Sequence, residues 1–324
     1  MSFLTKLPRD QYVLNAFDRF SASQEAFDLG IARALAWACQ LAYETDETEK
    51  VTSLAAGWGL EVCPGGILSK EIVTVLPKAS TQVIVLDHGD AFIITFAGTD
   101  PLVLADWISN FDIGVTATGV ANGFAVAAAA VTDQIAEILS TSEANKPIFV
   151  AGHSLGGALA VLCAKKINVT NFGRVRAVYT FGMPRPGNAE FATAYDQLLG
   201  MRTYRLVHGH DVVPTVAPSF FGFRHVGRYL HCGRAAKFDA RSMAVLVGSD
   251  DPPFLQGISK ELKGLLHGSF SGVLSIAERL KIIAALAVGG SLSGMRSDPG
   301  GLMIELLPPP LRDHMPDRYI RAIS

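Results

Sequence analysis

The hydrophobic pattern of the chain changes from helical spacing to strand-like runs within the first hundred residues. Residues 24–44 place Ala, Ile, Leu and Trp at helical spacing after Ser23, a suitable helix cap. Short apolar or β-branched runs at residues 71–76, 82–86 and 91–96 are separated by turn-like sequences. These runs predict successive strands joined by tight turns.

Beyond residue 120, helical and strand-like segments alternate. The pattern predicts helices at residues 124–139, 156–166 and 189–199 and strands at residues 147–151, 175–181 and 203–207. Strands that alternate with helices form a mostly parallel sheet with helices on both faces. We therefore predict an α/β fold built on such a central sheet.

The regular alternation weakens after Tyr229. Residues 252–290 combine apolar helical segments with few charges, which we interpret as a helical insertion near the C-terminus. A Gly/Ser-rich stretch and three prolines follow, and a short helix is predicted at residues 316–323. Because no repeat or linker divides the chain, we expect one domain over residues 1–324.

Composition narrows the classes of protein. With 49% hydrophobic and 18% charged residues, the chain is not disordered. Its 28 Lys and Arg against 30 Asp and Glu leave no positive excess, so we expect no nucleic-acid partner. The mean hydropathy of +0.29 is high, but the longest uncharged stretch, residues 113–132, is broken by glycines and threonines. We predict no transmembrane helix and a large core or an apolar pocket.

The N-terminal sequence and the cysteine spacing bear on the cellular location of the protein and on the state of its thiols. Arg9 and Asp10 stand where a signal peptide needs its apolar run, so we expect a cytoplasmic protein or export by a leaderless route. The cysteines show no CxxC or CxxH spacing, which argues against zinc. Without a secretion signal, buried thiols are favoured over disulfides for Cys39, Cys63, Cys163 and Cys232.

The strongest chemical signal is the segment Gly152-His153-Ser154-Leu155-Gly156, which follows a predicted strand and precedes a predicted helix. This G-x-S-x-G pattern in this context is the nucleophile elbow of α/β-hydrolases. The turn presents the Ser154 hydroxyl above the sheet, and the N–H of Leu155 opens the helix where an oxyanion would form. The alternative is a Gly-rich turn with an incidental serine, which the flanking strand and helix disfavour.

A serine nucleophile needs a histidine base and a carboxylate to orient it. In this fold the acid lies between the serine and the histidine in chain order. Asp211 follows the strand-like residues 205–207 through a glycine-containing turn, whereas Glu190 and Asp196 fall within a helical pattern. Asp211 is therefore our candidate acid, and a solvated loop carboxylate is the alternative.

Several histidines follow Asp211 and compete for the role of base. We favour His314, in the loop between the proline run and the last predicted helix, because such a loop can carry an imidazole over the sheet edge. His267, on or beside an apolar helix, remains the main alternative. His225 lies only 14 positions after Asp211 and better suits a pocket wall.

A second oxyanion donor should follow an earlier strand. Residues 92–96 form an apolar strand that ends in Ala97-Gly98-Thr99. Thr99 offers its backbone N–H and its hydroxyl, and Leu155 N–H offers the other donor. An ordinary turn is the alternative for Gly98 and Thr99 taken alone.

Together these segments resemble the class 3 lipases, an α/β-hydrolase family that includes triacylglycerol lipases of filamentous fungi. The matching motifs are Phe96-Ala97-Gly98-Thr99, Gly152 to Gly157 (GHSLGG), Phe181 to Asn188 (FGMPRPGN), Asp211-Val212-Val213-Pro214, and Asp313-His314 with Tyr319. The resemblance implies Ser154 as nucleophile, Asp211 as acid, Thr99 and Leu155 as oxyanion donors, and supports His314 as base. The segment between His225 and His314 is longer than in the compact fungal enzymes, which keeps His267 open.

The family also has a short amphipathic lid after the oxyanion loop, near a tryptophan. The corresponding segment here is residues 100–106, just before Trp107, and it contains consecutive apolar residues. This implies a lid that exposes apolar surface at a lipid–water interface. A wall of the pocket that does not move is the alternative.

The residues and the resemblance together predict a serine hydrolase. The expected reaction is hydrolysis of carboxylic esters of lipids, of the triacylglycerol type, through an acyl-enzyme, with no metal or organic cofactor. The alternatives are a phospholipase A1 or galactolipid acyl hydrolase of the same family, and a lipase-like scaffold without turnover.

Overall fold

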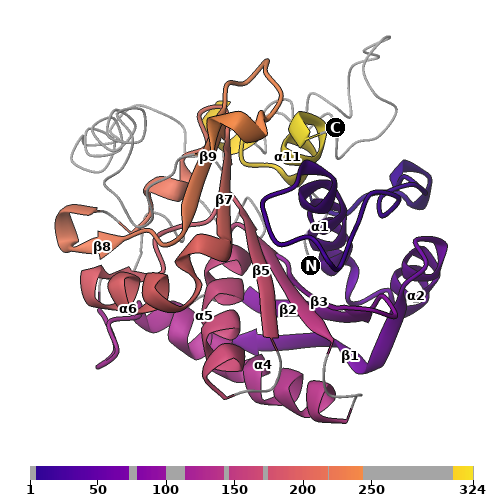
Figure 1. Cartoon of the computed structure of the whole chain (residues 1–324), viewed down its shortest axis with the longest axis horizontal. Helices are drawn as coiled ribbons and strands as arrows, with labels where there is room; N and C mark the ends of the chain where they lie inside the picture. The colour runs from indigo at the N-terminus through magenta and orange to yellow at the C-terminus, as the bar shows by residue number, and fades with distance from the viewer. Residues whose placement is uncertain are drawn as a thin grey trace, which may run out of the picture.

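A seven-stranded sheet forms the centre of the protein, with strand order β1-β2-β3-β4-β5-β7-β9 (Figure 1). The computed structural model describes residues 5–72, 79–99, 114–141, 146–170, 174–217, 219–243 and 309–323. The strands of the sheet are β1 Glu61–Ile72, β2 Ala79–Asp87, β3 Phe92–Phe96, β4 Pro147–His153, β5 Arg174–Phe181, β7 Thr203–His208 and β9 Arg228–Cys232. A separate pair joins β6 Gly187–Asn188 to β8 Phe223–Arg224.

The direction of the strands divides the sheet into two parts. β1, β2 and β3 pair antiparallel, whereas β3, β4, β5, β7 and β9 are all parallel. The predicted mostly parallel sheet is confirmed. Because the five parallel strands end at one edge, the loops that follow β3, β4, β7 and β9 all leave the sheet at this carboxyl edge.

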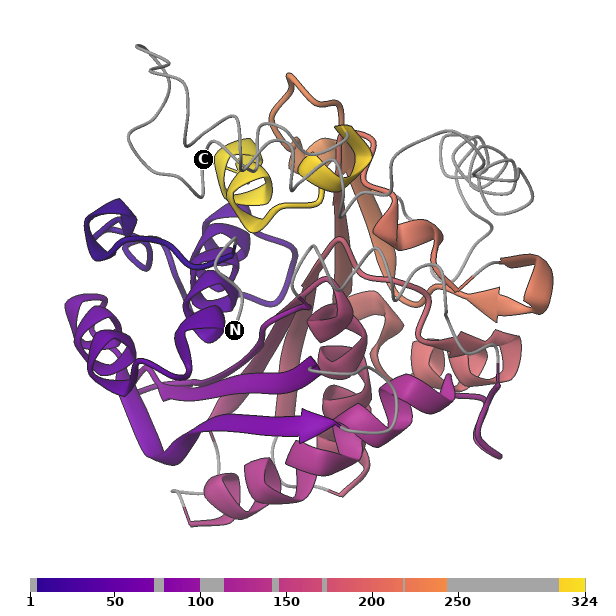
Figure 2. The same ribbon diagram turned by 180° about the vertical axis from the view of Figure 1, so that it is seen from behind.

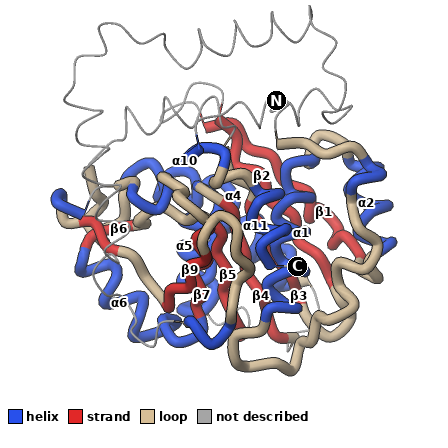
Figure 3. Tube along the Cα trace, turned by 90° about the horizontal axis from the view of Figure 1, so that it is seen from above, coloured by secondary structure: helices blue, strands red, loops and turns tan. Residues whose placement is uncertain are grey.

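Helices cover both faces of the sheet (Figures 1 and 2). One face carries α1 Leu29–Leu41, α2 Thr48–Gly57 and α11 Pro316–Ile323, and the other carries α4 Asn122–Ser140, α5 Leu155–Val169 and α6 Ala189–Leu199. The short helices are α10 Pro309–Arg312 and the 3-10 turns η1 Arg9–Gln11, η2 Ala42–Glu44, η3 Gly200–Arg202, η4 Val213–Thr215, η5 Ser219–Phe221 and η6 Ala240–Ser242. α1 and α11 lie side by side, although they are far apart in the sequence (Figure 3).

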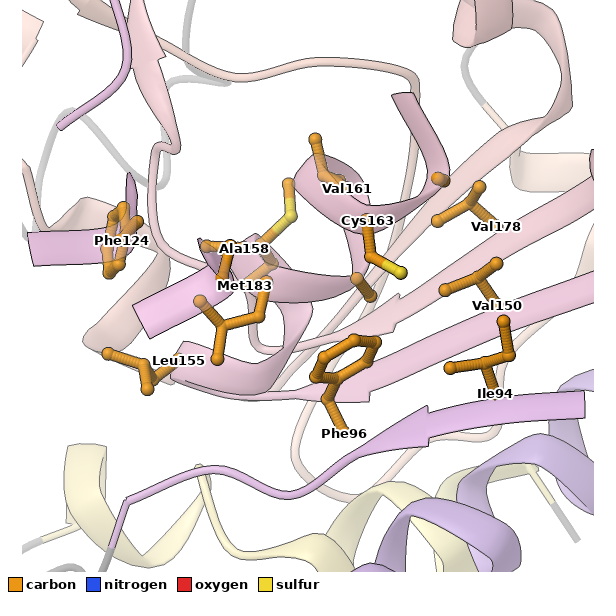
Figure 4. Packing of buried hydrophobic residues seen from close by; sticks show 14 of the residues in the cluster. Ile94, Phe96, Phe124, Val150, Leu155, Ala158, Val161, Cys163, Val178 and Met183 are labelled. Atoms are coloured by element: carbon orange, nitrogen blue, oxygen red, sulfur yellow. The ribbon is translucent and has the colours of Figure 1, made fainter. Parts of the chain in front are cut away.

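The two-residue period of the strands builds a separate hydrophobic core on each face. In β2, Val83 and Val85 pack toward α4 and α5, and Ile84 and Leu86 pack toward α1 and α2. Figure 4 shows the first of these cores, where strand residues meet residues of α5: Ile94, Phe96, Val150, Val178, Ala158, Val161 and Cys163. Each buried Val, Leu or Ile contributes about 1.5–3 kcal/mol, so burial on both faces holds the strand ends in place.

Most predicted elements after residue 120 agree with the structure. The predicted helices at residues 124–139, 156–166, 189–199 and 316–323 and the strands at residues 147–151, 175–181 and 203–207 are confirmed to within a few residues at each end. The helix predicted at residues 24–44 is too long at its start. It begins after Asp28, whose side chain accepts a hydrogen bond from Ile31 N at 2.9 Å, so Asp28 rather than Ser23 is the cap.

A tertiary contact explains the late start of α1. The N–H of Asp28 donates to the hydroxyl of Tyr179 at 3.2 Å, and the ring of Phe27 packs against Tyr179 and Tyr204. These contacts hold the preceding chain along β5 and β7 in a path that is not helical. Local spacing does not reveal such a contact.

The strand predicted at residues 71–76 overlaps the end of β1, a strand that begins earlier than the sequence pattern indicated. β1 begins at Glu61 and ends at Ile72, and residues 73–78 lie outside the described part of the chain. Pro64 and the glycines after it suggest a turn, but here they form an irregularity between Val62 and Ile67. An edge strand tolerates a proline and a bulge, so β1 continues through them.

α4 is the one helix in the described part of the chain that is long and apolar enough to cross a membrane. It packs against β1, β2 and α5, and Phe124, Val131 and Ile135 are buried there. We therefore interpret α4 as a core helix.

Two other predictions concern cysteines and inserted segments. All four cysteines are free and buried, as predicted. The predicted lid at residues 100–106 and the predicted helical insertion at residues 252–290 lie outside the described residues.

Candidate active site

Ser154 occupies a sharp turn between β4 and α5. Its φ of 57° makes it the one non-glycine residue with positive φ among the described residues. The N–H of Ser154 donates to the carbonyl of Phe181 at 2.8 Å, and its own carbonyl accepts from Gly157 N at 2.9 Å. Such backbone costs about 1–3 kcal/mol and persists only where the surroundings impose it. The turn is therefore held by β5 on one side and by the start of α5 on the other.

Asp211 and His314 form a buried pair. The Nδ1 of His314 donates to Asp211 Oδ2 at 2.8 Å, and Val213 N donates to Asp211 Oδ1 at 2.9 Å. Asp211 follows β7, and His314 lies between α10 and α11. The exposed fractions are 0% for Asp211 and 2% for His314. The carboxylate thus selects the tautomer of His314 in which Nε2 is unprotonated and can accept a proton.

The end of β5 joins this pair to Ser154. Ser154 N bonds to Phe181, the last residue of β5. The next residue, Gly182, has a φ of 64°, and a Cβ added to it would lie 2.5 Å from Asp211 Oδ2 and 2.8 Å from His314 Nδ1. The structure therefore brings Ser154, Asp211 and His314 to one strand end.

Two buried polar atoms at this place have no hydrogen-bond partner among the described residues. They are Ser154 Oγ and His314 Nε2, a hydroxyl donor and an imidazole acceptor. Ser154 is itself fully buried. Burying polar atoms without partners costs about 1–3 kcal/mol each, which native structures accept mainly where the atoms have another role. Hydrogen bonds of this kind often form fully only when a substrate is present.

The loop after β3 passes directly beside Ser154. A Cβ added to Gly98 would lie only 2.5 Å from Ser154 Cβ. Thr99 follows and is 9% exposed. On the other side, Leu155 begins α5, so its N–H has no acceptor within the helix. The two predicted oxyanion donors therefore lie near Ser154. Thr99 is in the loop after β3, and Leu155 is the first residue of α5.

His153 is a residue of the site that the sequence analysis missed. Its Nδ1 accepts from the Tyr43 hydroxyl at 2.7 Å, and its Nε2 donates to the carbonyl oxygen of His314 at 2.7 Å. Burial lowers the pKa of His153 well below its usual range, and the nearby His314 acts in the same direction. A neutral His153 thus ties the main chain of His314 to η2, the turn that follows α1. The motif contains His153 but assigns it no such role.

Tyr319 is a second buried residue that supports the Asp211–His314 pair through hydrogen bonds. Its hydroxyl donates to Asp211 Oδ2 at 2.5 Å and accepts from His208 N at 3.2 Å. Burial raises the pKa of Tyr319 well above its usual value, and the charge of Asp211 adds to the effect. Asp211 Oδ2 therefore receives two donors, one from His314 and one from Tyr319. In the sequence, Tyr319 stood out only through the family resemblance.

The remaining candidate histidines lie elsewhere. His225 is buried and its Nε2 bonds to the carbonyl of Pro214 at 2.8 Å, and His231 Nε2 bonds to the carbonyl of Gly209 at 2.9 Å. Both rings support loops through main-chain contacts. His267, the alternative base, lies outside the described residues.

Comparison with known proteins links this geometry to a family. Residues 93–221 match the family model described as lipase (class 3). A secreted mono- and diacylglycerol lipase of Malassezia globosa is 41% identical over 86 residues, which cover 26% of this chain and 28% of that protein. A secreted mono- and diacylglycerol lipase of Fusarium solani is 39% identical over 129 residues, covering 37% and 38%. The chain therefore spans about a third of the length of these curated relatives.

Solved structures support the same fold. A triacylglycerol lipase whose catalytic centre is formed by a serine-protease triad superposes with a TM-score of 0.53 and 22% identity, covering 70% of this chain and 89% of that one. This likeness shows the α/β-hydrolase fold. The segment that matches the family runs from β3 through the Ser154 turn and Asp211. Over this segment, which is about 40% of the chain, the protein is similar to the class 3 lipases.

Proposed function

We propose that this protein is a serine lipase that hydrolyses carboxylic esters of acylglycerols. The observation that carries the proposal is the Asp211–His314 hydrogen bond of 2.8 Å beside the strained, buried turn of Ser154. A carboxylate, an imidazole and a hydroxyl gathered in a dry place are the parts of a proton relay. The relatives support the substrate class, because they are mono- and diacylglycerol lipases.

In the proposed acylation step, Ser154 Oγ attacks the ester carbonyl carbon while His314 Nε2 takes its proton. The negative charge then develops on the former carbonyl oxygen, where the N–H groups of Thr99 and Leu155 stabilise it. Asp211 stabilises the positive imidazolium of His314. The alcohol leaves after His314 returns the proton to its oxygen.

Deacylation repeats the relay with water as nucleophile. His314 removes a proton from water, the resulting hydroxide attacks the acyl-enzyme, and Ser154 leaves with the proton from His314. The fatty acid is released and the enzyme returns to its starting state. These steps need no metal or organic cofactor.

Covalent labelling tests the nucleophile. We expect diethyl p-nitrophenyl phosphate to add one diethylphosphoryl group to Ser154, as seen by peptide mass spectrometry. Ser154→Ala should lose both the label and at least ~10³-fold of the rate on p-nitrophenyl esters. Ser140→Ala, which changes an exposed serine at the end of α4, is the matched control. Full activity in the Ser154 variant would refute the proposal.

A second experiment separates the two candidate bases. His314→Ala and His267→Ala are compared on an ester series of increasing acyl length and on acylglycerol emulsions. The proposal expects at least ~10³-fold loss for His314→Ala and a small change for His267→Ala. The reverse result would assign the base to His267. The same series defines the preferred acyl chain.

A further inference from the structure

A hollow of about 360 Å³ opens beside the candidate active site, between the loop after β9 and the helices α10 and α11. In Figure 1 this orange loop lies next to the yellow C-terminal helices. β9 is parallel to β7, so the loop leaves the same edge of the sheet as the turn that carries Asp211. The side chains that matter for its chemistry are Arg234, Lys237, Arg312, Arg318, Arg321 and Asp313.

Positively charged side chains gather around this hollow, although the chain as a whole has a slightly negative net charge. Five cationic side chains line it, and Asp313 is the carboxylate in its wall. Asp317 pairs with Arg321 at 3.2 Å and with Arg318 at 3.6 Å. Among the residues that the structure describes, five cations and two carboxylates line or border the hollow, whereas the whole chain has a net charge of −2. Such a local field attracts anions.

Several of these cations keep donors that face solvent. The Arg234 guanidinium holds Asp313 through Nε and one terminal nitrogen at 2.7–3.0 Å, yet its side chain is 42% exposed. The side chain of Arg321 is 47% exposed. Lys237 is exposed, and its ammonium group donates to the carbonyl oxygen of Arg321 at the end of α11. Arginine has five N–H donors and lysine three, so each of these groups can also bind an added ligand.

We propose that this hollow binds a phosphate-type oxyanion. Guanidinium forks match the paired oxygens of a phosphate, and an ammonium group adds a point charge to the same ligand. The ligand is either the headgroup of an anionic phospholipid or a soluble phosphate compound. The experiment below distinguishes these two sources.

The position of the hollow relates it to catalysis. Asp313, in its wall, directly precedes His314, and its Oδ2 accepts from His210 N at 2.8 Å, next to Asp211. Arg234, Asp313 and the two catalytic loops thus form one connected surface. An anionic headgroup held here would place the lipid surface beside the candidate active site.

Vesicle binding tests the headgroup source. Ether-linked phosphatidylcholine vesicles, with or without ether-linked phosphatidic acid, contain no carboxylic ester, so the result does not depend on the proposed hydrolysis. We expect the protein to sediment with the anionic vesicles and to stay in solution with the neutral ones. Each basic residue near an anionic surface contributes about fivefold to binding, so the double variant Lys237→Gln/Arg321→Gln should bind about 25-fold more weakly.

A matched control tests the place of the charge. Lys166→Gln/Arg176→Gln also removes two cations, but these pair with Asp133 and Glu25 on other parts of the surface. It should bind vesicles as the unmodified protein does. Thermal unfolding and circular dichroism, measured without ligand, establish that both double variants are folded. Equal weakening in the two variants would attribute binding to overall charge and overturn the proposal.

Inorganic phosphate tests the soluble source. We expect phosphate to raise the unfolding temperature above that in sodium chloride of the same ionic strength, and the Lys237/Arg321 variant to lose this rise. Vesicle binding without a phosphate effect assigns the site to a lipid headgroup, and a phosphate effect without vesicle binding assigns it to a soluble ligand. If neither appears, the proposal is wrong, whatever the esterase activity of the protein.

Discussion

Two fully buried carboxylates, Asp211 and Glu44, lie in different regions of the molecule and are neutralised in different ways. Glu44, in η2, accepts from the Tyr12 hydroxyl at 2.9 Å and from Leu7 N at 3.0 Å through Oε1. Its Oε2 faces Lys50 Nζ at 2.9 Å. A permanent cation and two donors thus compensate this charge, and the segment before α1 is held in place by it.

Asp211 has no lysine or arginine within ion-pair distance among the described residues. Its donors are Val213 N, the Tyr319 hydroxyl and His314 Nδ1. Its partner His314 is a group that becomes positive only when it takes up a proton. The difference teaches that a permanent cation compensates Glu44, whereas Asp211 is paired with a group that can gain charge, as the proposed proton relay requires.

Exchanging each carboxylate for its amide gives the largest expected contrast. Asp211→Asn should lower kcat on a soluble p-nitrophenyl ester by about 10⁴-fold, because the amide supports the wrong tautomer of His314. Glu44→Gln should lower the free energy of unfolding by about 3 kcal/mol, because it breaks a buried ion pair, and leave kcat within about fivefold. Urea unfolding and initial rates measure both. If the two variants lost activity alike while folded, the contrast would be wrong.

Crowding at Gly182 is expected to have the next largest effect. Gly182→Ala places a methyl group against Asp211 and His314, and should reduce kcat by about 10²-fold and stability by about 1–3 kcal/mol. Gly59→Ala is the matched control, because Gly59 has a φ of 75° with no atom within 4 Å of the added Cβ. It should lose stability through backbone strain and retain its activity. Similar rates for the two variants would show that His314 tolerates the crowding.

A milder test removes the tyrosine hydroxyl that donates to each carboxylate. Tyr319→Phe should lower kcat about tenfold, and Tyr12→Phe should lower only stability, by about 1.5–3 kcal/mol. Without the Tyr319 donor, Asp211 loses one of the contacts that orient it toward His314. The loss in Tyr319→Phe should therefore fall on kcat, with KM within about twofold of the unmodified protein. An unchanged kcat in Tyr319→Phe would show that the hydroxyl does not help to position Asp211.

The pH dependence of stability gives the smallest effect. The pKa of His153 is lowered by burial, so below pH 6.5 the unfolded chain binds a proton that the folded protein excludes. Stability is therefore highest above pH 6.5 and falls as the pH decreases, by at most about 1.4 kcal/mol per pH unit for this residue. His225 is lowered by burial as well and adds to the slope. In His153→Gln the slope between pH 7 and 5 should be smaller, and an equal slope would contradict the neutral state of His153.

Sequence alone could locate Ser154 and Asp211 because local information is enough. The strand, the glycines and the helix around Ser154 are consecutive in the chain, and the order of acid and base limits the choice of Asp211. The base stayed open between His314 and His267, because no local pattern says which distant loop reaches the sheet edge. The structure settles only the position of His314, beside Asp211.

The contacts of the supporting residues were beyond sequence reasoning for the same reason. Tyr43 meets His153 across 110 positions, and Tyr319 meets Asp211 across 108 positions. Each contact depends on how α1 and α11 pack on the sheet, which amphipathic spacing does not determine. Likewise, the start of α1 depended on Asp28 meeting Tyr179, and the start of β1 on an edge strand that absorbs Pro64.

The 103 positions between Asp211 and His314 also bear on how the protein would acquire its proposed activity. Closing so long a stretch of chain is entropically costly and belongs to the slowest phase of folding. Helices and the antiparallel strands can form earlier from near neighbours. On refolding from denaturant, ester cleavage should return later than the circular dichroism signal. The rate at which cleavage returns would then report when the His314 loop docks beside Asp211.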